Sequence, residues 1–246
     1  MANPILRVTD LNISFGSRAI IRDLSFEVRE GDCLAIIGPN GAGKTVLLKA
    51  LLKLIPYRGE IRWSPGARLG YVPQKIAADR QLPLRAKDLL SAKAKFLKLP
   101  SAEWERVAQE LDITSDLLDV SIGQLSGGQF QKILIAFAIL GGPNALLFDE
   151  PTASLDELTE ERIYELVYSL QKDKGMTILL VSHDLSVVFR NASMVLCLSK
   201  GKPCTGPPKE ILTPAMLQEL YGGSPHYYQH LHEHERLAGG NQEGAP

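Results

Sequence analysis

The hydrophobic positions of this chain gather in short apolar runs separated by glycine-rich or polar segments. Three such runs, residues 34–37, 144–148 and 176–181, are bounded by turn residues, and this pattern predicts buried strands. Residues 46–55, with the sequence VLLKALLKLI, predict a buried helix that Pro56 ends. An apolar stripe at helical spacing predicts another helix, ended by Lys174-Gly175; its members are Ile163, Leu166, Val167 and Leu170.

The rest of the pattern divides into a strand-rich and a helical part. Residues 5–30 and 57–73 read as short strands with turns, and we expect them to form an antiparallel sheet beside the first buried strand. Residues 75–142 read as mostly helical, with one amphipathic stripe formed by Trp104, Val107, Ala108 and Leu111. Residues 85–98 are basic and amphipathic, which fits either a solvated face over a small core or a docking surface for a membrane partner.

Composition narrows the class of protein. The chain has 246 residues, 45% of them hydrophobic, and a formal net charge of −1, which argues against a nucleic-acid partner. Three widely spaced cysteines without a CxxC motif favour a reducing cytosolic compartment, with Cys33 and Cys197 as core residues. No signal peptide is visible, and the longest apolar run, 133–140, is far shorter than the roughly 20 residues that span a bilayer. Any membrane role would therefore depend on partners.

A glycine-rich segment joins the first predicted strand to its helix. This context distinguishes a phosphate-binding P-loop from a simple connecting turn. Backbone N–H groups would hold phosphate oxygens, and the helix N-terminus adds positive potential. We expect Lys44 to reach the β- and γ-phosphates of a nucleotide and Thr45 to offer its hydroxyl to Mg²⁺. The predicted phosphate-binding residues are Gly38, Pro39, Asn40, Gly41, Ala42, Gly43, Lys44 and Thr45.

Two adjacent carboxylates, Asp149 and Glu150, end the second buried strand. Neighbouring side chains on a strand point to opposite faces, so the two can take separate roles. Asp149 is the candidate to bind Mg²⁺, directly or through water, and Glu150 is the candidate to orient and deprotonate an attacking water. A solvated strand end is the alternative when no P-loop accompanies the pair.

Two polar side chains follow other predicted strands. His183 lies at the carboxyl end of residues 176–181, the edge where parallel α/β sheets bind ligands, and we expect it to donate to the γ-phosphate. Gln74 follows residues 70–73, and its amide could contact the metal or the water, although a single glutamine is uninformative.

The segment LSGGQ, residues 125–129, precedes a helix predicted over residues 130–140. Ser126 and Gln129 have the spacing of a capping box, so a well-capped helix start explains them. The alternative is a second anion site, in which the Gly127 and Gly128 N–H groups, the Ser126 hydroxyl and the helix dipole would all point outward. Two copies packed head to tail would let this site close on the γ-phosphate held by the partner.

In this order, over roughly residues 5–212, the motifs resemble those of the ATP-binding-cassette (ABC) ATPases. The resemblance implies an α/β fold: a P-loop NTPase (RecA-like) parallel core with an antiparallel β flank and an inserted α-helical subdomain. It also implies a homodimer in which ATP is hydrolysed with Mg²⁺. Phe15 corresponds to an aromatic that stacks on adenine, and Asp156 of the D-loop would lie near the dimer seam.

The resemblance further assigns residues to the two sides of each site. Gln74, His183 and the P-loop and carboxylate residues would act in cis, and Ser126, Gly127 and Gly128 in trans. After the signature the family commonly has Gln-x-Gln-Arg, whereas this chain has Gln129-Phe130-Gln131-Lys132, which keeps the charge and loses the bidentate geometry of arginine.

Four of the five histidines lie near the C-terminus. His226, His230 and His234 share a face of a helix, and His230, His232 and His234 share a face of an extended chain. Either arrangement could hold Zn²⁺, whereas a polar tail without metal or an accessory helix at a dimer contact fits equally. We expect an ABC ATPase domain over residues 1–215, with the helical subdomain at about 75–142, and a histidine-containing tail over 216–246.

In motif order and loop length the chain is most similar to ATP-binding subunits of bacterial zinc and manganese uptake systems. This implies an importer for a divalent transition metal, with an integral-membrane permease and, indirectly, an extracytoplasmic substrate-binding protein as partners. The chain would be peripheral, at the cytoplasmic face of the plasma (inner) membrane. The alternatives are an importer for another substrate, a soluble assembly ATPase such as that of iron–sulfur cluster assembly, and a metal sensor gated by the tail.

Overall fold

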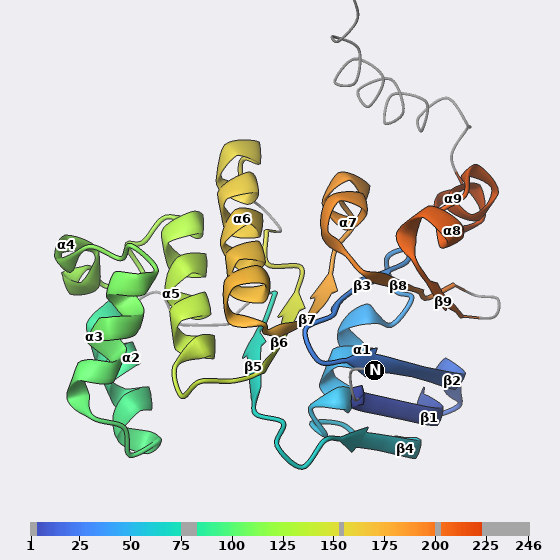
Figure 1. Ribbon diagram of the computed structural model, residues 1–246, viewed down its shortest axis with the longest axis horizontal. Coiled ribbons are helices and arrows are strands. Elements are labelled where there is room, and N and C mark those ends of the chain that lie inside the picture. The colour runs from blue at the N-terminus through green and yellow to red at the C-terminus, as the bar shows by residue number, and fades with distance from the viewer. Residues whose placement is uncertain (1–3, 75–82, 153–154, 200–202, 223–246) are drawn as a thin grey trace, which may run out of the picture.

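The computed structural model describes residues 4–74, 83–152, 155–199 and 203–222 (Figure 1). Among these residues the main sheet has six strands in the order β5-β6-β7-β3-β8-β9. The first five run parallel and the last is antiparallel to its neighbour. The bounds are β5 (Leu69–Val72), β6 (Ala145–Asp149), β7 (Thr177–Val181), β3 (Cys33–Ile37), β8 (Met194–Cys197) and β9 (Cys204–Gly206). Every residue of β3, β6 and β7 is buried, which confirms the three predicted strands.

A second, antiparallel sheet packs with α1 (Lys44–Leu51) against one face of the main sheet (Figure 1). Its order is β2-β1-β4, with bounds β1 (Pro4–Phe15), β2 (Arg18–Arg29) and β4 (Arg58–Trp63). Leu24 of β2, Leu34 of β3 and Leu48 of α1 belong to one buried cluster. This sheet is the antiparallel flank that the sequence predicted.

Helices cover the opposite face and extend into a separate group. The group consists of α2 (Ala86–Phe96), α3 (Ser101–Glu110), α4 (Ser115–Asp119) and α5 (Gly127–Ile139). Val107, Ala108 and Leu111 are buried in the cluster that also holds α5, and Trp104 packs at its edge, as the amphipathic stripe predicted. The face itself carries α6 (Glu157–Lys174), α7 (Leu185–Asn191), α8 (Pro208–Ile211) and α9 (Pro214–Tyr221). The inserted α-helical subdomain is therefore present.

Three predicted elements differ in detail. Residues 57–73 do not form one antiparallel unit, because β5 pairs in parallel with β6; the Asn144 side chain accepts from the Arg68 N–H at 2.8 Å and fixes this alignment. The helix predicted over 46–55 ends at Leu51 because Lys53 has a φ of +58°, outside the helical region. The helix predicted over 130–140 starts earlier, at Gly127.

Helix α9, the last helix among the described residues, crosses the boundary expected between the ATPase domain and the tail. Leu217 and Leu220 are buried in a cluster with Ile37 of β3 and Val195 of β8. His226, His230, His232 and His234 lie outside the described residues. Within the described ranges, no helix is both long enough and apolar enough for a membrane span.

Candidate nucleotide-binding site

Four neighbouring strands of the main sheet carry the predicted functional residues at one edge. Across the order β5-β6-β7-β3, the carboxyl ends lead into Gln74, Glu150, His183 and the P-loop at residues 38–45. The carboxyl edge of a parallel sheet is where ligands bind in this class of fold. Residues separated by more than a hundred positions in sequence are thus gathered along one edge.

The P-loop begins at a position that only glycine can occupy. Gly38 has a φ of +150°, and a Cβ atom there would lie 2.2 Å from the Leu198 carbonyl oxygen. The loop leads into Lys44, whose side chain is only 7% exposed. Its ammonium donates to the carbonyl oxygens of Gly38 at 2.9 Å and Pro39 at 3.5 Å. The lysine is therefore held inside the curve of the loop.

Asp149 is almost fully buried at the end of β6, with 1% exposure. The Thr45 hydroxyl donates to Oδ1 at 2.8 Å, and the Tyr71 hydroxyl donates to Oδ2 at 3.3 Å. Burial raises the pKa of Asp149, while these two hydrogen bonds oppose the shift. A hydroxyl beside a carboxylate at a phosphate-binding loop is a set of hard oxygen donors, which fits Mg²⁺.

Glu150 directly follows Asp149. Its backbone φ of +47° is rare for residues other than glycine. Its carboxylate accepts from Gln74 Nε2 at 2.5 Å and lies 3.4 Å from Lys44 Nζ. The Glu150 carboxylate thus contacts both Gln74 and Lys44. A carboxylate held this way, beside the buried lysine of a P-loop, is a candidate to accept a proton from a water at this edge.

His183 and Phe15 are both on the surface. His183 lies between the buried Ser182 and the Asp184 N-cap of α7, and its side chain is exposed. Phe15 ends β1 and is 51% exposed, which leaves a ring face free for stacking. The P-loop lies against the strand after this turn, since a Cβ at Gly43 would lie 2.7 Å from Ile20 Cγ2.

The signature residues Ser126 to Gln129 lie at the start of α5, on the sheet face opposite α1 (Figure 1). Ser126 and Gln129 form the predicted capping box: the Ser126 N–H donates to Gln129 Oε1 at 2.9 Å, and the Gln129 N–H to Ser126 Oγ at 3.2 Å. Gly127 is exposed, and a Cβ at Gly128 would lie 2.3 Å from Thr159 Cγ2. The glycines therefore allow close packing against α6 and leave the start of α5 open.

Asp156 is the N-cap of α6. Its carboxylate accepts from the Thr159 N–H at 3.0 Å and from the Thr159 hydroxyl at 2.7 Å, and these bonds lower its pKa. The residue thus sets the start of the helix that packs on the signature glycines.

Sequence reasoning missed several hydroxyl residues around this edge. Tyr71 binds Asp149 from β5, and Thr152, Tyr164 and Ser182 form a buried chain behind Glu150 and His183. Ser182 opens the Ser182-His183-Asp184 segment, but only the fold shows that it joins Tyr164 and Thr152. In the part of the chain that the structure describes, no group of three or more His, Cys, Asp or Glu side chains is placed to hold a metal ion.

A P-loop after β3 and paired carboxylates at the end of β6, on the same edge of one parallel sheet, define a P-loop nucleoside triphosphatase fold. A family model described as "ABC transporter" matches residues 21–153, and the chain belongs to this family.

Relatives and solved structures agree with this assignment. A zinc import ATP-binding protein ZnuC from Hydrogenovibrio crunogenus is 35% identical, with 94% of each chain covered. One from Yersinia pestis is 37% identical, with 94% of this chain and 92% of the relative covered. An inward-facing ABC transporter of the metal-chelate type has a TM-score of 0.81 at 27% identity, covering 89% of this chain and 90% of that one. CbiO1 of Clostridium perfringens, part of an ABC transporter complex, has a TM-score of 0.75 at 25% identity, covering 92% and 99%.

Proposed function

We propose that this chain is the ATP-hydrolysing subunit of an ABC importer for zinc or a similar divalent transition metal. The observation that carries the ATPase assignment is the row of Gln74, Glu150, His183 and the P-loop along one sheet edge. The substrate is supported by the relatives named as zinc import proteins, which match over nearly the whole chain. The ATPase domain would occupy residues 1–215 and the tail 216–246.

In this proposal the residues of one chain bind ATP and prepare the water. The P-loop N–H groups and Lys44 bind the phosphates, and Glu150 orients the attacking water and takes its proton. Lys44 now lies 3.4 Å from Glu150, so its move toward the phosphates would leave Glu150 free to act on the water. His183 contacts the γ-phosphate. The Gln74 amide, which donates to Glu150, would also contact the metal or the water.

Mg²⁺ would be held by Thr45 and Asp149, with Gln74 as a further oxygen donor, and would neutralise charge on the phosphates. Asp149 is buried and already accepts from two hydroxyls, so its position is fixed before any cation binds.

A second copy of the chain would complete each site. The open start of α5 offers the Ser126 hydroxyl, the Gly127 and Gly128 N–H groups and Gln129 to the partner's γ-phosphate, and Asp156 lies near the seam. Phe15 would stack on the adenine. The homodimer would act with an integral-membrane permease, fed by an extracytoplasmic binding protein, at the cytoplasmic face of the inner membrane.

Metal uptake in cells tests the substrate. In a strain from which the gene is deleted, the wild-type chain should restore zinc accumulation, measured by elemental analysis, and Glu150→Gln should not. Manganese and a metal chelate serve as competing substrates. If the wild-type chain restores accumulation of manganese or of a metal chelate but not of zinc, the ATPase assignment stands and the proposed substrate is replaced.

A further inference from the structure

A chain of buried hydroxyl groups runs behind the carboxyl ends of β6 and β7. The Thr152 hydroxyl lies 2.6 Å from a Glu160 carboxylate oxygen and 3.1 Å from the Tyr164 hydroxyl. The Tyr164 hydroxyl lies 3.1 Å from Ser182 Oγ, which accepts from the Asp184 N–H at 3.0 Å. Thr152, Tyr164 and Ser182 are all at most 4% exposed. Such buried hydroxyls are costly unless each has a partner, and here each has two.

The chain of donors has one consistent direction. A carboxylate only accepts and a hydroxyl has one proton, so Thr152 donates to Glu160. Tyr164 then donates to Thr152, and Ser182 donates to Tyr164. Burial raises the pKa of Tyr164, which keeps its proton available for this role. Tyr164 is the middle member, and without its hydroxyl the hydrogen-bond chain between Thr152 and Ser182 is interrupted.

The two ends belong to the loops that carry the proposed water-activating glutamate and the proposed γ-phosphate ligand. Thr152 lies two residues after Glu150, and Ser182 directly precedes His183. One backbone bond also joins these loops, from the Glu150 N–H to the Val181 carbonyl at 3.2 Å. Because the φ of Glu150 is +47°, its backbone is held in a conformation that needs support from its surroundings.

We propose that Tyr164 is a positioning residue for ATP hydrolysis, whose hydroxyl fixes the loop of Glu150 relative to the loop of His183. The inference rests on the proposed roles of those two residues. It assigns to α6 a function in the catalytic step, besides its packing against the sheet.

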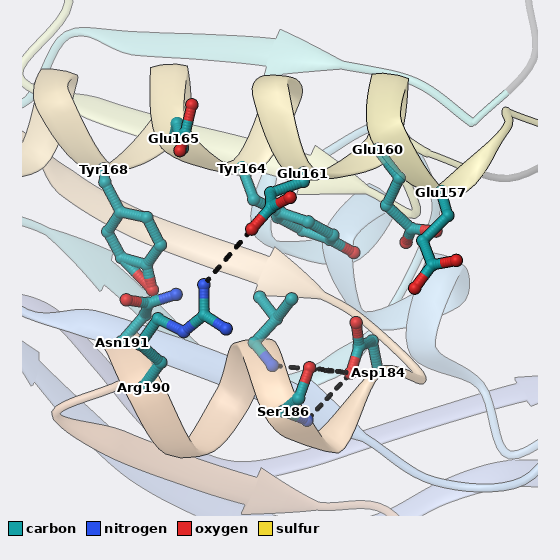
Figure 2. Close-up of a pocket in the computed structure, with 11 residues that line it drawn as sticks. Glu157, Glu160, Glu161, Tyr164, Glu165, Tyr168, Asp184, Ser186, Arg190 and Asn191 are labelled. Carbon is teal, nitrogen blue, oxygen red and sulfur yellow. Dashed lines mark hydrogen bonds and ion pairs between the residues drawn. The ribbon is translucent and has the colours of Figure 1, made fainter. Parts of the chain in front are cut away.

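The next turn of the same helix supplies a matched control. Figure 2 shows Tyr164 and Tyr168 both extending from α6 toward α7. The Tyr168 hydroxyl is also buried, but it has no hydrogen-bond partner among the residues that the structure describes. Tyr164→Phe and Tyr168→Phe therefore remove the same atom from the same helix, and only the first removal interrupts the hydroxyl chain.

The test is steady-state ATP hydrolysis by the full-length chain. Tyr164→Phe should lower kcat about tenfold with the KM for ATP unchanged, because only the transition state needs the aligned loops. Tyr168→Phe should keep the wild-type kcat. In a His183→Ala background, Tyr164→Phe should cause no further loss, since the partner that it positions is gone. A wild-type kcat for Tyr164→Phe, or the same loss in both backgrounds, would overturn the proposal.

A second variant covers the case in which Tyr164→Phe fails to fold. Ser182→Ala removes the neighbouring member of the chain and should reproduce the loss in kcat at constant KM; wild-type activity would overturn the proposal. Substitutions of the two proposed catalytic residues distinguish a failure of this inference from a failure of the proposed site. If Glu150→Gln and His183→Ala themselves retain full turnover, the proposed catalytic roles fail. If they lose turnover and Tyr164→Phe does not, only the positioning role fails.

Discussion

The two parts of the proposed ATP site differ in how far one chain completes them. At the sheet edge, Lys44 and Asp149 are buried and hydrogen-bonded, and Glu150 is held by Gln74. At the start of α5, Ser126 and Gln129 are exposed and bond mainly to each other. This difference is what we expect if the sheet edge carries out chemistry within one chain and the signature forms an open surface for a second molecule.

The largest effect is expected at Glu150. Glu150→Gln keeps the size and a hydrogen-bonding oxygen but removes the base, so ATP turnover should fall by at least about 100-fold. ATP binding should persist, and the ATP-bound dimer should accumulate because the hydrolysis step that reopens it is blocked. Turnover assays, nucleotide-binding titration and size-exclusion chromatography with ATP measure these results. Normal turnover would remove Glu150 from the chemistry.

Mixing two inactive chains tests whether the two parts of a site come from different copies. Lys44→Ala damages the sheet edge and Ser126→Arg damages the signature, so each homodimer should be inactive. A mixed dimer would contain one site with both parts intact, and ATPase activity should exceed that of either variant alone. The matched control mixes Lys44→Ala with Glu150→Gln. Both lesions then lie at the sheet edge, every site is damaged, and no recovery is expected.

Recovery in the first mixture alone would support head-to-tail sharing. Equal recovery in both mixtures would mean that the damaged chains help each other by another route, and recovery in neither, with mixed dimers shown to form, would contradict the shared site.

A smaller effect separates two glycines of the P-loop. Gly38→Ala places a Cβ 2.2 Å from the Leu198 carbonyl oxygen and should reduce the free energy of unfolding by about 3 kcal/mol or more. Gly41 has a φ of +80° with open space around its Cβ position, so Gly41→Ala should cost only about 1–2 kcal/mol of backbone strain. Urea unfolding measures both. Equal losses would show that the Leu198 contact does not constrain the loop.

The sequence predicted best where a local signal coincides with a functional one. The P-loop, the capping box of Ser126 and Gln129 and the three buried strands each depend on neighbours within a few residues. The helical insertion was predicted from the helical pattern of residues 75–142, and the antiparallel flank from the strand pattern of residues 5–30 and 57–73. The roles assigned to the site residues remain predictions.

The main error in the predicted fold lies where contacts between segments distant in sequence determine the structure. β5 joins the parallel sheet because Arg68 meets Asn144, far along the chain, and periodicity cannot report such a pairing. The same limit hid Tyr71, whose partner Asp149 ends β6, and Tyr164 of α6, whose partner Ser182 follows β7. Near Lys53, an apolar run continued past the true end of α1, so the hydrophobic pattern outlasted the helix.

The smallest effect concerns how the signature helix is attached. Lys93 of α2 donates to the Phe137 carbonyl of α5 and lies 4.4 Å above the Phe137 ring, and burial lowers its pKa from 10.5 to about 8. Below pH 8 both the folded and the unfolded chain are charged at this residue, and the folded state bears the cost of burying the ammonium. As pH rises from about 8 to 10.5, only the unfolded state keeps the proton, so this contribution to stability increases.

Lys93→Met has no ionisable group at this position. Raising the pH from 7 to 9.5 should therefore raise the Tm of the wild type relative to the Tm of Lys93→Met. Lys95→Met, at an exposed position of the same helix, is the control; a difference that stays constant with pH for Lys93→Met would mean that this contact does not place the lysine in a buried setting.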